Sequence, residues 1–79
     1  MTVLLFARLR EIAGTPALNR QLPDGATAQT AWNELAREFP PMAEYERSIS
    51  CAVNEDYARF STVLHEGDEI AFLPPVSGG

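Results

Sequence analysis

The chain has 79 residues, of which 46% are hydrophobic and 22% are charged, and its formal net charge at pH 7 is −5. This length and composition predict one small, soluble globular domain over residues 1–79 with a marginal hydrophobic core. The negative charge argues against nucleic acid as a partner, because phosphate groups repel an acidic surface. No apolar stretch approaches the roughly 20 residues of a membrane span, so we expect no membrane association.

The first third of the chain predicts two strands. Residues 3–8 are apolar on both faces, which is typical of a central strand or of a strand whose second face contacts a partner. Residues 9–13 predict a helical turn that ends at Gly14. Residues 18–22 alternate between apolar and polar side chains and predict a second strand, and residues 23–25 (Pro-Asp-Gly) predict a turn.

The clearest element is a helix that begins after Thr27, a favourable N-cap residue. Apolar side chains then recur at helical spacing along one stripe. The stripe consists of Ala28, Ala31, Trp32, Leu35, Ala36 and Phe39. Pro40 and Pro41 end the helix, because proline lacks an N–H donor and clashes with the preceding turn. We interpret the stripe as a surface that packs against a sheet, not as a surface that stacks on a cofactor.

The second half of the chain predicts three further strands. Residues 49–54 alternate in polarity, residues 57–60 form a short segment, and residues 70–73 follow a charged turn at residues 65–68. The order is strand, strand, helix, strand, short strand, strand. It predicts an α+β protein with the β-grasp (ubiquitin-like) fold, in which one main helix packs on one face of a mixed sheet.

This fold predicts an apolar patch on the sheet face away from the helix. Pleating places Phe6 on the face opposite Val3 and Leu5, and it places Leu73 opposite Phe72. If the other members of these strands pack on the helix, Phe6 and Leu73 point outward.

The side chains form no catalytic constellation. Cys51 is the only cysteine, so no internal disulfide can form, and it lies between Ile49 and Val53 on one strand face, where a buried thiol is inert. His65 is the only histidine and lies in a turn, so we assign it no general-base role. The acidic residues near it fit a charged turn better than a metal cluster, and we expect no metal site.

The segment at residues 74–79, PPVSGG, is the candidate functional element. Pro74 and Pro75 remove two backbone donors, so strand pairing ends there and the chain becomes extended. Gly78 and Gly79 add no side-chain bulk, so their carboxylate can enter a narrow slot in a partner. We expect a flexible tail that reaches roughly 20 Å, at about 3.3 Å per residue. Once its carboxylate is activated, this tail becomes an acyl donor.

Two motifs connect the chain with a known family. The first is FARLRE at residues 6–11, followed by Gly14, and the second is GDEIAFLPPVSGG at residues 67–79. The second motif is highly specific, because it combines a turn, a strand, two prolines and a glycine tail. With these motifs the chain resembles the small subunit of molybdopterin synthase over essentially its whole length. Residues 15–48 match that family only generically.

The resemblance implies a sulfur carrier of molybdenum cofactor biosynthesis. An adenylating enzyme similar to ubiquitin-activating enzymes would use ATP to form an acyl-adenylate on Gly79, and sulfur would then replace one oxygen to give a thiocarboxylate. The tail would enter the large synthase subunit and donate sulfur to cyclic pyranopterin monophosphate, and two transfers would build the dithiolene of molybdopterin. The chain itself would bind no permanent cofactor.

The resemblance also implies which residues contact partners. In a heterotetramer with the large subunit, Gly78 and Gly79 would form the reacting end, and the catalytic side chains would belong to the large subunit. The implied interface residues are Phe6, Tyr57, Leu73, Pro74, Pro75, Val76 and Ser77. The adenylating enzyme, itself nucleotide-binding, would be a second partner. An apolar start too short for a signal peptide, together with the lack of a stretch long enough to span a membrane, indicates the cytoplasm.

Three other interpretations remain open. A thiamin-pathway sulfur carrier would share the fold and the tail, although the motif at residues 6–11 and the Pro74-Pro75 pair favour the molybdenum pathway. A ubiquitin-like modifier would join its terminus to lysines of other proteins. An interaction module with an inert tail would show no ATP-dependent change at its terminus.

Overall fold

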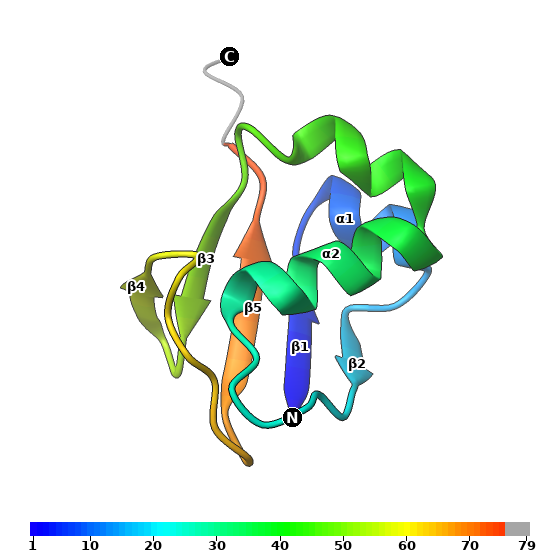
Figure 1. Ribbon diagram of the computed structural model, residues 1–79. Helices are drawn as coiled ribbons and strands as arrows, with labels where there is room; N and C mark the ends of the chain where they lie inside the picture. Colours follow the sequence, from blue (N-terminus) through cyan, green and yellow to red (C-terminus); the bar gives the residue numbers. More distant parts are fainter. Residues whose placement is uncertain (76–79) are drawn as a thin grey trace.

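Within residues 1–75, five strands form one mixed sheet, and helices cover one of its faces (Figure 1). The computed structural model describes residues 1–75. The strands are β1 (Thr2–Leu5), β2 (Ala17–Asn19), β3 (Ser50–Val53), β4 (Asp56–Ala58) and β5 (Glu69–Leu73). The helices are α1 (Arg8–Ala13), α2 (Ala28–Glu38) and the 3-10 helix η1 (Pro40–Tyr45). No helix in residues 1–75 is both long enough and apolar enough to span a bilayer.

The strand order in the sheet is β2-β1-β5-β3-β4, with the first and last strands of the chain paired at the centre. β1 and β5 run parallel, whereas the β1–β2, β5–β3 and β3–β4 pairs are antiparallel. A parallel pair requires a crossover connection, and the segment that contains α2 belongs to that connection. This topology confirms the predicted α+β class and the β-grasp arrangement of a mixed sheet with one main helix on one face.

Helix α2 begins and ends where its sequence predicts. The Thr30 backbone N–H donates to Thr27 Oγ1 at 3.3 Å, and the Thr27 N–H donates to Thr30 Oγ1 at 3.1 Å. These two bonds satisfy donors that a helix start would otherwise leave free. The helix ends at Glu38, and Pro40 occupies the first turn of η1. Proline is tolerated in a first turn because an N–H group there would have no partner within the helix.

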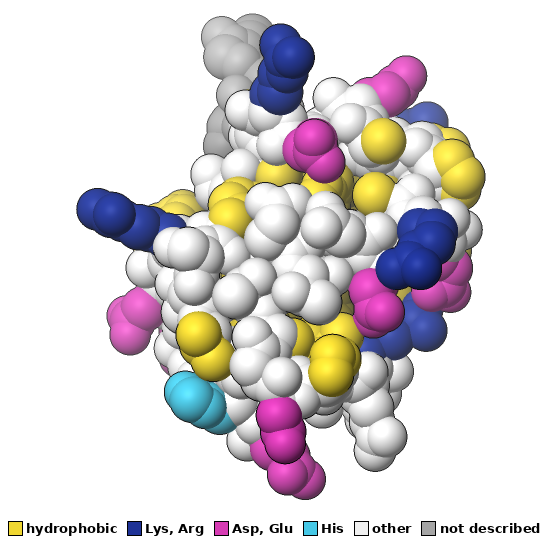
Figure 2. Space-filling view, in the orientation of Figure 1, with side chains coloured by type: hydrophobic (Ala, Val, Ile, Leu, Met, Phe, Trp, Pro, Cys, Tyr) yellow, Lys and Arg dark blue, Asp and Glu magenta, His cyan; other side chains and the backbone are white. Residues whose placement is uncertain are grey.

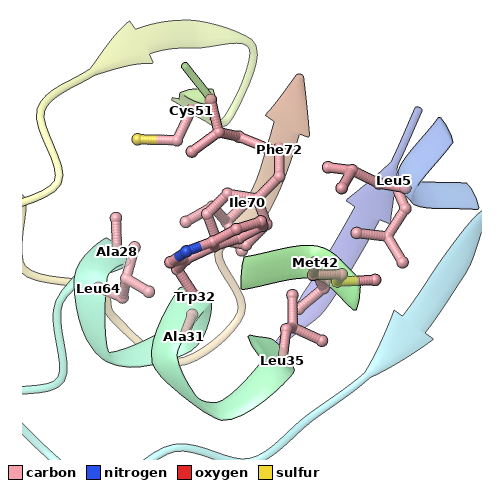
Figure 3. Close-up of a cluster of buried hydrophobic side chains, with 13 residues drawn as sticks. Leu5, Ala28, Ala31, Trp32, Leu35, Met42, Cys51, Leu64, Ile70 and Phe72 are labelled. Carbon is pink, nitrogen blue, oxygen red and sulfur yellow. The ribbon is translucent and has the colours of Figure 1, made fainter. Parts of the chain in front are cut away.

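The core lies between α2 and the helix-facing side of the sheet (Figure 3). Trp32 is fully buried, and its ring lies 5.3 Å from the ring of Phe72 with a tilt of 56°. Tilted aromatic pairs at this separation are attractive beyond their area of burial. The core also contains Val3, Leu5, Leu9, Ala28, Ala31, Leu35, Met42, Ile49, Cys51, Leu64 and Ile70. The Trp32 stripe is therefore a packing surface, as predicted.

Several strand boundaries differ from the sequence prediction, most of all those of β1, β2 and β4. β1 stops at Leu5, because the Phe6 carbonyl accepts the Leu9 N–H at 3.1 Å and turns the chain into α1. Ala7 adopts φ 51° in that turn, a conformation that costs a non-glycine residue energy. β2 covers only Ala17–Asn19, and β4 covers Asp56–Ala58 instead of residues 57–60. Helix η1 had no counterpart in the prediction.

A side-chain network ties the β3–β4 hairpin to the turn before β5. Asn54 Nδ2 donates to Asp68 Oδ1 at 3.0 Å, and Asn54 Oδ1 accepts the Glu69 N–H at 3.0 Å. The His65 N–H donates to Asp68 Oδ2 at 2.8 Å. The hydrogen bond from Asn54 and then the one from His65 lower the pKa of Asp68. Both bonds favour the ionised carboxylate.

This pKa shift predicts a pH-dependent contribution to stability. The folded pKa of Asp68 lies below its ordinary value of about 3.9, so the carboxylate stabilises the fold above that pH and stops doing so as pH falls through the folded pKa. We expect Asp68→Asn to lower the melting temperature most at neutral pH, with the difference narrowing below about pH 4. Thermal unfolding across pH measures this, with Asp24→Asn as the control. A difference that stays constant down to pH 3 would contradict the assignment.

Candidate functional site: the outer sheet face and the exit of the tail

The sheet face away from α2, here called the outer face, carries an apolar row across four strands. Strand pairing aligns Leu4 of β1 with Ala71 of β5, Ala71 with Ala52 of β3, and Ala52 with Tyr57 of β4. Alternation along β1 explains the row, because Val3 and Leu5 are buried on the helix side while Leu4 points the other way. The outer face is thus apolar at its centre.

A hollow of about 280 Å³ lies on this face. The small side chains of Ala52 and Ala71 form its floor, since larger residues surround them on both sides. The lining residues are Leu4, Phe6, Ala52, Glu55, Tyr57, Glu69, Ala71 and Leu73. Phe6 is 44% exposed and Tyr57 is 81% exposed, and Leu73 is half-buried. Exposed aromatic side chains around an apolar hollow are typical of protein-binding surfaces.

The structure therefore brings together three of the seven residues that the resemblance implies for an interface. Phe6, Tyr57 and Leu73 come from separate parts of the chain and line one hollow. Exposure of Phe6 on the outer face agrees with the expected alternation. Sequence reasoning missed Leu4, Ala52 and Ala71, because the alanines form a floor only through the β3–β5 register. The two glutamates at the hollow, Glu55 and Glu69, were also missed.

The chain leaves the sheet next to this hollow. Leu5 pairs with Phe72, so Phe6 and Leu73 are level at the end of the parallel pair. β5 ends at Leu73, and Pro74 and the exposed Pro75 lie outside any strand. Proline supplies no N–H for pairing, which explains why the strand stops there. Val76, Ser77, Gly78 and Gly79, which the sequence assigned to the site, lie outside the described residues.

Cys51 lies on the opposite side of the sheet, within the core (Figure 3). Its side chain is 1% exposed, and Sγ donates to the Ala58 carbonyl at 3.3 Å. Burial raises the pKa of the Cys51 thiol, because a thiolate is poorly solvated there. Since the thiolate is the nucleophile, Cys51 has the features of a structural residue.

For the sulfur carrier that the resemblance implies, we expect Cys51→Ala to leave sulfur transfer at the wild-type rate. The removed thiol is small, so the free energy of unfolding should fall by about 1–2 kcal/mol. Denaturant unfolding measures the stability, and transfer to the pterin precursor measures the activity. A well-folded Cys51→Ala protein that transfers no sulfur would show that the sulfur is carried on this residue.

The remaining polar candidates are separate from the hollow. His65 is exposed, and its backbone N–H is committed to Asp68. Within residues 1–75, no three His, Cys, Asp or Glu side chains are grouped as metal ligands would be.

These features define a ubiquitin-like β-grasp protein whose C-terminal segment leaves the sheet beside an apolar hollow. The chain belongs to the ThiS family, whose model matches residues 3–79. It is similar to the molybdopterin synthase sulfur carrier subunit of Arabidopsis thaliana, with 43% identity over 77 residues that cover 98% of this chain and 80% of the relative.

Solved structures share the fold. The crystal structure of SAMP1 from Haloferax volcanii superposes with a TM-score of 0.81 at 31% identity, covering 99% of this chain and 97% of that one. A chain in the protein–protein complex of subunits 1 and 2 of the molybdopterin-converting factor from Helicobacter pylori has a TM-score of 0.68 at 22% identity, covering 99% and 96%. The second likeness concerns the fold alone.

Proposed function

We propose that this chain is the sulfur carrier subunit of a molybdopterin synthase. The observation that carries the proposal is the position of Pro74 and Pro75, where the chain leaves the sheet beside an exposed apolar hollow. The relationship to the Arabidopsis sulfur carrier subunit spans the same elements, with 98% of this chain covered. Delivery of a group into a partner requires a docking surface and, next to it, the point where the segment that carries the group leaves the fold.

The chemistry of the tail follows from its carboxylate. A carboxylate is a poor electrophile until one oxygen becomes a good leaving group, and adenylation by an ATP-dependent enzyme supplies that group. Attack of sulfur on the Gly79 carbonyl carbon then expels AMP and leaves a thiocarboxylate. The thiocarboxylate sulfur bonds to cyclic pyranopterin monophosphate, and water then cleaves its bond to the Gly79 carbonyl carbon, which leaves the sulfur on the pterin and restores the Gly79 carboxylate. Two rounds supply the two sulfurs of the dithiolene.

The partners divide the work of this reaction. The large synthase subunit covers the outer face and receives the tail, and it supplies the catalytic side chains and the pterin site in a heterotetramer. A ubiquitin-activating-like adenylyltransferase binds ATP and acts on the same tail in an earlier step. The carrier needs no permanent cofactor for either step. The requirement for ATP favours the cytoplasm as its compartment.

A second candidate is a ubiquitin-like protein modifier. SAMP1 stands for small archaeal modifier protein 1. The similarity to SAMP1 of Haloferax volcanii, at 31% identity and a TM-score of 0.81, therefore favours this function. Both functions begin with the same adenylate, and they differ in the acceptor of the Gly79 acyl group. In a carrier the acceptor is sulfur, whereas in a modifier it is a lysine amine of another protein.

Mass spectrometry of the intact chain tests the proposal. The chain is incubated with the adenylating enzyme, Mg-ATP and a sulfide source, and then with the large subunit and the pterin precursor. We expect a mass gain equal to replacement of one oxygen by sulfur, and we expect that gain to disappear as the dithiolene forms. A covalent conjugate with other proteins and no thiocarboxylate would favour the modifier. An unchanged terminus would refute both.

A further inference from the structure

The basic side chains of this chain are positively charged, but none of them is an amine. All six are arginine, at positions 8, 10, 20, 37, 47 and 59, and the sequence contains no lysine. A guanidinium remains protonated in proteins, so it does not attack an acyl group, whereas a lysine amine does. The activated terminus of the proposed function would therefore meet no side-chain amine on its own surface.

The thiol is also out of reach. Cys51 is 1% exposed on the helix side of the sheet, its Sγ–H donates to the Ala58 carbonyl, and burial raises its pKa. Attack on an acyl group requires an accessible thiolate. The fold therefore buries the only thiol of the chain, so this thiol does not attack the activated terminus.

The α-amine of Met1 lies at the far end of the sheet. Thr2 pairs with Glu69 in the parallel β1–β5 pair, so Met1 is level with Asp68, seven residues before Pro75. Extended chain rises about 3.3 Å per residue, which puts roughly 23 Å between Met1 and Pro75. The four residues that follow Pro75 span at most about 14 Å. Figure 1 shows the N-terminus at the opposite end of the sheet from the point where β5 ends.

Two arginines lie at the end of the sheet where the tail leaves. Arg59 follows Ala58, which pairs with Cys51, so Arg59 is level with Ser50 and its partner Leu73. Arg47 precedes Ser50 by three residues and lies beyond this end of β3. Both side chains belong to exposed residues, and neither forms an ion pair within residues 1–75. Figure 2 shows a dark blue side chain projecting at this end of the molecule.

We propose that Arg47 and Arg59 are specificity-determining residues that keep positive charge at the tail exit in a form that cannot be acylated. The inference rests on the proposed function, because it concerns the activated terminus. A lysine at either position would attack the Gly79 carbonyl carbon. The new C–N amide bond would form as the bond to the leaving group broke, and the leaving group would depart with the proton lost by the amine. Arginine at these positions reserves the acyl group for a partner.

A chemically activated chain tests this without any adenylating enzyme. The 79-residue chain is released from an intein fusion as a C-terminal thioester of a small thiol and is held at mildly alkaline pH. The variants are Arg47→Lys and Arg59→Lys. Arg47→Gln controls for loss of the guanidinium. Gln21→Lys adds an exposed amine at the end of the sheet opposite the tail exit, because the backbone N–H of the neighbouring Arg20 donates to the Met1 carbonyl.

We expect the wild type, Arg47→Gln and Gln21→Lys to lose the thioester by hydrolysis alone. Arg47→Lys and Arg59→Lys should lose it on the order of tenfold faster or more, because an amine held near the carbonyl has a high effective concentration. Their product should be a chain that has released the small thiol and formed an internal amide. A peptide map should show Gly79 joined to the lysine at position 47 or 59. Equal rates and no internal amide in both variants would overturn the proposal, as would an internal amide in the wild type.

The outcome is independent of the proposed function. The thioester is made without ATP, so a chain that is never adenylated still gives the predicted difference between arginine and lysine. A chain that is loaded with sulfur by its activating enzyme but acylates its own surface as a thioester would refute this inference and leave the carrier function standing.

Discussion

Deletion of Gly79 is expected to abolish sulfur loading and leave the melting temperature unchanged. The reacting carboxyl would then lie one residue short of its position in the activating enzyme, which is about 3.3 Å. A displacement of that size removes the positioning on which acyl transfer depends, and displacements of about 1 Å already cost roughly 100-fold in rate. Intact mass after incubation with the activating enzyme, ATP and sulfide measures the loading.

Substitution of Gly78 distinguishes the effect of tail bulk on sulfur loading from the effect of tail length. Gly78→Val keeps all 79 residues but adds a branched side chain and restricts the backbone, so it should block entry into a narrow slot nearly as completely. Gly78→Ala is the matched control and should retain more loading than Gly78→Val. A chain without Gly79 that still gains sulfur at its C-terminus would overturn the carrier function.

Helix α2 was fully predictable from the sequence because all of its determinants are local. Thr27 caps its start, its apolar stripe has helical spacing, and Pro40 follows its last residues. Strands β3 and β5 were predictable for a similar reason, since their apolar alternation is visible in short windows. The edge strands β2 and β4 are only three residues long, so their ends depend on pairing with a neighbour and were misplaced.

The end of β1 was not predictable, and its cause lies in the backbone. Phe6 and Ala7 continue an apolar run that reads as strand, yet Ala7 adopts φ 51° and starts α1. A glycine at position 7 would have signalled such a turn, and alanine does not.

The candidate site was predictable in part. Phe6 and Leu73 follow from pleating once the helix side of the sheet is assigned, and the tail follows from its prolines and glycines. The floor of the hollow needs the pairing of Ala52 with Ala71, two residues far apart in the chain. Register between distant strands is set by the whole fold, so no local pattern contains it.

Phe6→Asp or Leu73→Asp is expected to weaken binding of the large subunit by about 2 kcal/mol or more, roughly 30-fold in Kd. Each change places a charge at the edge of the hollow, where a partner would have to desolvate it. Neither residue belongs to the buried core, so the melting temperature should change little. Isothermal titration against the large subunit measures the affinity, and circular dichroism checks the fold.

Val63→Asp is the matched control for these substitutions. Val63 is 47% exposed, close to the 44% of Phe6, but it does not line the hollow. It bridges to Thr27 at the start of α2, on the other side of the core. The same aspartate at a similarly exposed apolar position should therefore leave the affinity unchanged. Equal affinities for Phe6→Asp, Leu73→Asp and the wild type would show that the large subunit does not dock on the outer face, and weakening by Val63→Asp alone would move the interface to the helix side.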